Sequence, residues 1–139
     1  MKTNPIVFNS SNEQSYYTLL LMRVVASVLL VFSASYWALL VGISDSATRF
    51  DSMSTSWQLA AASLVVLQPV AALGLWGGWR WGVVMWVFVA AIEFTMYGIY
   101  PDIFGEANFL LIFHAVGILA YICMALFLNA KSESVIEED

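Results

Sequence analysis

Two ionisable residues, Glu93 and His114, interrupt long apolar segments and are the strongest candidates for chemistry in this sequence. Glu93 lies seven residues before Tyr100, where one apolar segment ends, and His114 lies six residues after Asn108, where the next begins. In helices these spacings place the two side chains about 10 Å and about 9 Å from the same end. The connection at 101–107 is short, so the two helices should be neighbours. We therefore expect a Glu–His contact that shares one proton and titrates as a coupled pair.

Other polar side chains are expected at a similar distance from the same end of the helices. Tyr97 shares the helical face of Glu93, and Tyr121 shares that of His114. Gln68 and Ser35 are expected to complete an intramembrane cluster. Three uses are open for it: it locks the helices in register, it binds a quinone-like or lipid head group, or it moves a proton or cation.

The sequence shows no strong catalytic motif, and we expect no enzymatic activity. A single histidine cannot supply two axial haem ligands, and one His with one Glu gives fewer ligands than a structural metal site normally has. We therefore predict neither a metal nor an obligatory cofactor, although a quinone or lipid is compatible with the cluster. The one cysteine excludes a disulfide within the chain.

Long apolar segments must position these residues. Hydrophobic residues make up 61% of the 139 residues and charged residues 11%. Each segment meets the ~20 residues that a helix needs to cross a bilayer. We predict an all-α membrane protein, an antiparallel four-helix transmembrane bundle over 18–129, with spans at about 18–43, 57–76, 80–100 and 108–129. Residues 1–17 are expected to form an N-terminal tail, and residues 130–139 an acidic tail.

Charge indicates how the chain is oriented. The net charge of -5 argues against nucleic acid as a partner. Lys2, Arg23, Arg80 and Lys131 lie on the side that holds both termini, against Arg49 alone on the other. This bias predicts that both termini are cytoplasmic.

The connections and helix ends carry further candidates. The loop at 44–56 is expected to form a local clasp between Arg49 and two carboxylates, Asp45 and Asp51, or to dock a periplasmic partner. Gly77 and Gly78 predict a tight turn between the second and third spans. The predicted interfacial anchors are Trp57, Trp76, Trp79, Arg80 and Trp81.

Several short motifs lie in the same order along the core: Arg49-Phe50-Asp51, Trp57-Gln58, the segments 67–76 and 81–86, Phe104-Gly105 and the later His114. Over about residues 17–129 the chain resembles an uncharacterised bacterial family of small four-helix inner-membrane proteins. The layout is also distantly similar to DoxX-type proteins, four-helix membrane partners of redox enzymes. Those proteins usually carry their glutamate on the second span, whereas Glu93 lies on the third, so no redox role carries over to it. The resemblance implies the fold and the membrane location, but no activity.

The function expected from the sequence is that of a non-catalytic inner-membrane protein, a small accessory or structural subunit of a larger complex. One alternative is a homodimeric proton-coupled transporter that uses Glu93. Another is a DoxX-like, quinone-linked redox partner. The expected partners are the lipid bilayer and either other membrane subunits or a second copy of the chain.

Overall fold

A computed structural model of the protein describes residues 10–43, 50 and 53–136. These residues form helices and short connections, with no β-strand among them. The elements, in chain order, are α1 (Ser10–Val41), α2 (Thr55–Trp76), α3 (Arg80–Phe94), the π-helix η3 (Thr95–Ile99), the short α4 (Pro101–Phe104) and α5 (Asn108–Ile136). The predicted all-helical class is confirmed.

Four apolar stretches are long enough to cross a membrane: Tyr16–Val41, Thr55–Trp76, Arg80–Ile99 and Asn108–Phe127, with mean hydropathies of 1.8 to 2.4. The outer helix ends differ from the prediction. Helix α1 begins at Ser10, within the predicted tail 1–17, and α5 continues to Ile136, through most of the predicted tail 130–139. Extending an existing helix needs no new nucleus, and residues such as Glu and Lys favour the helical state.

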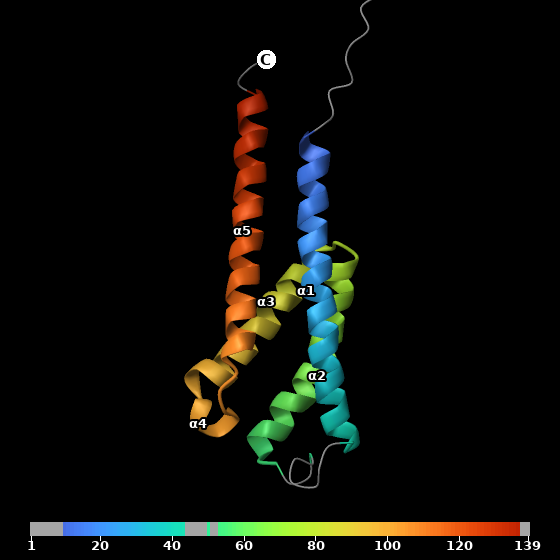
Figure 1. Ribbon diagram of the computed structural model, residues 1–139, viewed down its shortest axis with the longest axis vertical. Helices are drawn as coiled ribbons and strands as arrows, with labels where there is room; N and C mark the ends of the chain where they lie inside the picture. Colours follow the sequence, from blue (N-terminus) through green and yellow to red (C-terminus); the bar gives the residue numbers. More distant parts are fainter. Residues whose placement is uncertain (1–9, 44–49, 51–52, 137–139) are drawn as a thin grey trace, which may run out of the picture.

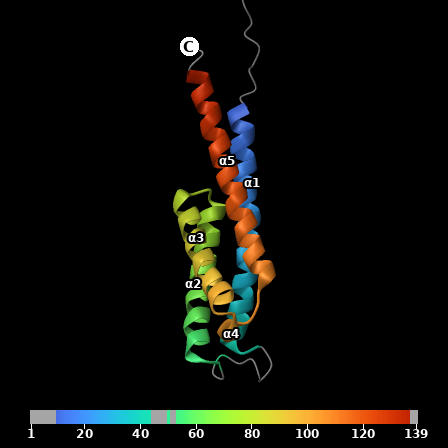
Figure 2. The ribbon, with the colours of Figure 1, turned by 90° about the vertical axis from the view of Figure 1, so that its left-hand side faces the viewer.

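Successive long helices alternate in direction (Figure 1). Helix α2 returns alongside α1, and α3 is inclined between them and α5. In both views the start of α1 and the end of α5 extend beyond the turn between α2 and α3 (Figure 2).

The α2–α3 turn packs tightly for two reasons. A Cβ added at Gly74 would lie 2.5 Å from the Gly82 Cα, so glycine at both positions lets the two backbones touch. Gly78 adopts φ +69, which L-residues rarely adopt, and a Cβ there would lie 2.7 Å from Leu19 Cδ2 of α1. The turn therefore sits at the level of Leu19, close to Tyr16 and Tyr17 in the chain.

The connection after η3 is partly helical. The sequence predicts that Pro101 stops the third helix. The helix does end before it, and Pro101 also opens α4 at its first position, where no backbone N–H is needed. Gly105, with φ +81, follows the last residue of α4.

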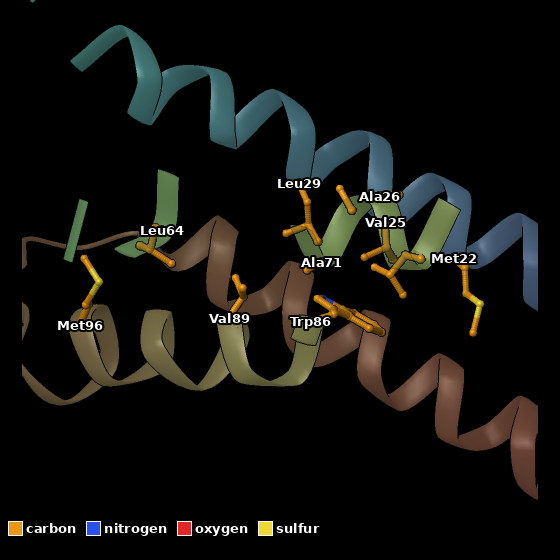
Figure 3. Packing of buried hydrophobic residues seen from close by; sticks show 11 residues of the cluster. Met22, Val25, Ala26, Leu29, Leu64, Ala71, Trp86, Val89 and Met96 are labelled. Carbon is orange, nitrogen blue, oxygen red and sulfur yellow. The ribbon is translucent and has the colours of Figure 1, made fainter. Parts of the chain in front are cut away.

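The core lies between α1, α2 and α3, and Trp86 is its largest buried side chain. Its ring lies on the side of α3 that faces Val25 of α1 (Figure 3). Gly117 of α5 makes room for the far edge of this ring, since a Cβ there would lie 2.9 Å from Trp86 Cζ2. Trp86 is thus fixed between α1 and α5, which sets the direction of its indole N–H.

Candidate functional site

Four buried side chains from three helices form one hydrogen-bonded series. Gln68 Nε2 of α2 donates to Glu93 Oε1 of α3 at 2.8 Å. Glu93 Oε2 contacts His114 Nε2 of α5 at 2.5 Å. Trp86 Nε1, also of α3, donates to His114 Nδ1 at 3.1 Å. None of the four side chains is more than 1% exposed. We call this series the buried network.

The partners of His114 fix the positions of its protons. An indole N–H only donates, so Nδ1 must accept and carries no proton. The ring is then neutral, with its single proton on Nε2, directed at Glu93 Oε2. Glu93 accepts on both oxygens, as a carboxylate does.

Gln68 leaves one polar atom unpaired. Its Oε1 is buried and has no hydrogen-bond partner. Turning the amide over would direct Oε1 at Glu93 Oε1, a contact that becomes favourable when that carboxyl oxygen carries a proton, and Nε2 would then be the unpaired atom of Gln68. The buried network is therefore compatible with two protonation states of Glu93, while His114 stays neutral in both.

Helix geometry explains why these residues meet. Trp86 and Glu93 are seven residues apart on α3, two turns along one face. His114 contacts both of them from α5, and Gly117, one turn further along, leaves space for the indole. The contact between Glu93 and His114 that the sequence predicts is present, and Gln68 joins it as expected.

The remaining members of the predicted cluster are not hydrogen-bonded to the buried network. The Tyr97 hydroxyl is 3.0 Å from that of Tyr36 on α1, and neither hydroxyl is bonded to the buried network. Tyr121 packs against the hydrophobic core. Ser35 is exposed and donates to the Val31 carbonyl of its own helix at 3.4 Å. Tyr97 nevertheless lies close enough to Glu93 to interact with it electrostatically, as its predicted place in the cluster requires. Ser35 and Tyr121 form no hydrogen bond with the buried network, because depth in a helix does not specify the direction of a side chain.

Most of the predicted anchors gather at the α2–α3 turn. Trp76, Trp79, Arg80 and Trp81 are exposed there, and the rings of Trp79 and Trp81 stack at 5.6 Å. Trp57 lies away from this turn, at the start of the apolar stretch of α2. Its ring is half-buried, 5.3 Å from that of Phe104, and its Nε1 donates to the Ile103 carbonyl at 2.9 Å. It ties the start of α2 to α4.

The predicted clasp of Asp45, Arg49 and Asp51 lies outside the described residues. Within the described part of the chain, no group of three or more His, Cys, Asp and Glu residues is placed to hold a metal ion.

Two contributions were missed by the sequence analysis. Trp86 was not recognised as the donor to His114, although a buried indole N–H usually needs an acceptor. No sequence pattern indicated the contact between Tyr36 and Tyr97, since the two residues are 61 positions apart in the sequence.

Comparisons with curated proteins and with solved structures give no match. A family model matches residues 16–132, which include all four apolar stretches and every member of the buried network. The chain therefore belongs to DUF6163, a family of unknown function.

Proposed function

We propose that this protein crosses the bacterial cytoplasmic membrane as an antiparallel four-helix bundle with both termini in the cytoplasm. Tyr16 and Tyr17 lie near Leu19, which the α2–α3 turn contacts. The exposed Trp79 and Trp81 of that turn would lie at the same level, as an aromatic belt does. Basic residues favour this side as the cytoplasmic one.

Within that membrane we assign the protein the role of a non-catalytic accessory subunit. The observation that carries this proposal is the closed state of the buried network. Both nitrogens of His114 and both oxygens of Glu93 are bonded within the chain, whereas a reaction centre needs a group that can meet its substrate. The network instead joins α2, α3 and α5.

The helix surfaces fit the same role. Only 17% of the apolar stretch of α5 is buried within the chain, against 44% of that of α2. Val116 and Leu119 are among the exposed residues of α5. Such a face packs against lipid or against the helices of another subunit.

The test is purification in mild detergent of the full chain with a C-terminal tag, followed by mass spectrometry of everything retained. The accessory role predicts a second membrane polypeptide in fixed stoichiometry. Leu119→Trp should release it, and Val84→Trp, on an exposed face of α3, should serve as the matched control. A homogeneous preparation of this chain alone would contradict the proposal.

A second candidate function, proton-coupled transport through Glu93, is favoured by the unpaired Gln68 Oε1. This atom gives a protonated Glu93 an acceptor once the amide turns over. Proteoliposomes that enclose a pH-sensitive dye should then show a proton flux that Glu93→Gln abolishes while the variant still folds. Equal fluxes in the wild type and the variant would exclude this role.

A further inference from the structure

A pocket of about 490 Å³ has none of the four residues of the buried network in its lining. It is partly open and is formed mainly by α1, the start of α2, η3 and the start of α5. Its walls are rich in aromatic rings, those of Phe32, Tyr36, Trp57, Tyr97 and Phe109. A volume of several hundred Å³ with apolar walls is typical of a small-molecule site.

One hydrogen-bond donor in this pocket has no acceptor among the described residues. The hydroxyls of Tyr36 and Tyr97 are 3.0 Å apart, so one O–H donates to the other. The accepting hydroxyl still has its own hydrogen, for which no acceptor is found among the described residues. The other polar groups of the lining are used, since Ser35 donates to Val31 and the Trp57 indole to Ile103.

Charge restricts the class of ligand. Among the described residues, no charged side chain lines the pocket, so a phosphate or carboxylate would lack a cationic partner in this part of the chain. A neutral ring with a carbonyl oxygen would accept the spare O–H and stack on the aromatic walls. Such a molecule would reach the pocket from the surrounding lipid.

We propose that this pocket binds a neutral, lipid-soluble ring compound that bears a carbonyl oxygen, the chemistry of a quinone head group, with the Tyr36–Tyr97 pair donating to that oxygen. The inference does not depend on the accessory role. It differs from the site expected from the sequence, which placed such a ligand at Glu93 and His114.

The tyrosine pair makes a specific prediction. In Tyr36→Phe or Tyr97→Phe the remaining hydroxyl no longer has a tyrosine partner and donates to the ligand, so each single variant should bind within about threefold of the wild type. The double variant has no donor and should bind about tenfold more weakly, the loss expected for one hydrogen bond. Tyr100→Phe, outside this pocket, is the matched control.

The experiment titrates the purified full chain in nanodiscs with a decyl-substituted benzoquinone and follows quenching of tryptophan fluorescence, since Trp57 lines the pocket. Decylbenzene, which has no oxygen, is the competitor. Decylbenzene should bind the wild type about tenfold more weakly than the benzoquinone does. Its affinity for the double variant should equal its affinity for the wild type. Ser35→Leu, which places a larger side chain in the pocket from an exposed position, should also weaken quinone binding.

Three results would overturn the proposal. Quenching that never saturates and is the same in every variant would show partition into the lipid alone. Unchanged quinone binding in Ser35→Leu would place the ligand elsewhere. Stronger displacement of the bound benzoquinone by phosphatidylglycerol than by an excess of a neutral ring ketone that does not quench tryptophan fluorescence would assign the pocket to phospholipid.

Discussion

Replacing Glu93 by either glutamine or leucine separates the hydrogen bonds of the buried network from its charge. In Glu93→Gln the new carbonyl oxygen accepts the His114 Nε2 proton, and the new amide donates to Gln68 Oε1 once that amide turns over. Each existing bond is then replaced: the Gln68 oxygen that now has no partner gains one, and the Gln68 Nε2 becomes the unpaired atom in its place. We expect the free energy of unfolding to stay within about 1 kcal/mol of the wild type, because the number of unpaired buried polar atoms does not change.

Glu93→Leu removes both acceptors. The Gln68 amide and the His114 Nε2 proton then stay buried without partners. In proteins generally, each such unpaired group lowers the free energy of unfolding by about 1–3 kcal/mol. Bonds between membrane helices are weaker, about 0.6 kcal/mol on average and at most about 1.7. We therefore expect the free energy of unfolding to fall by about 2–3 kcal/mol, the lower end of what two unpaired groups cost in soluble proteins.

The assay is unfolding in mixed micelles as the mole fraction of sodium dodecyl sulfate rises, followed by far-UV circular dichroism. Glu106→Gln, which removes an exposed carboxylate, controls for the change in net charge. If Glu93→Gln is as unstable as Glu93→Leu, the carboxylate itself holds the helices together and the hydrogen-bond account is refuted.

Three further predictions test the packing and the topology. Trp86→Phe leaves His114 Nδ1 without its donor and should cost about 1–3 kcal/mol in the same unfolding assay; an unchanged value would mean that the indole does not fix the ring. Gly74→Ala adds a Cβ 2.5 Å from the Gly82 Cα and should cost about 1–3 kcal/mol, whereas Gly98→Ala, with open space around it, should be unchanged or up to about 1 kcal/mol more stable. Equal effects of the two substitutions would contradict the tight α2–α3 contact. A C-terminal fluorescent protein that matures only in the cytoplasm should fluoresce, and a C-terminal alkaline phosphatase should be inactive; the reverse pattern would overturn the proposed orientation.

The sequence was sufficient for the four apolar helices, because hydropathy and length are summed over about 20 residues and tolerate local errors. It also predicted the contact between Glu93 and His114, since a short connection and equal depth left few alternatives. Helix ends were predicted less well, because an existing helix extends readily through polar residues such as those after Ser10.

Side-chain direction was the harder problem within the site. Tyr97 is four residues after Glu93 and shares its general face, yet its hydroxyl meets Tyr36 on α1 instead of the buried network. The direction depends on the π-helical turn that begins at Thr95 and on the approach of α1. Both are consequences of tertiary packing, and neither has a sequence signature as strong as a hydrophobic run.

The identity of residue 93 raises a question that packing alone does not answer. A glutamine there would form as many hydrogen bonds with Gln68 and His114 as the glutamate does, and a carboxylate inside a membrane costs free energy that an amide does not. If the network served only to hold α2, α3 and α5 in register, the amide would be the less costly choice. Unchanged stability in Glu93→Gln, together with loss of the proton flux into proteoliposomes, would therefore assign the carboxyl to proton binding. A proton flux equal to that of the wild type in the same variant would leave the carboxyl a structural role.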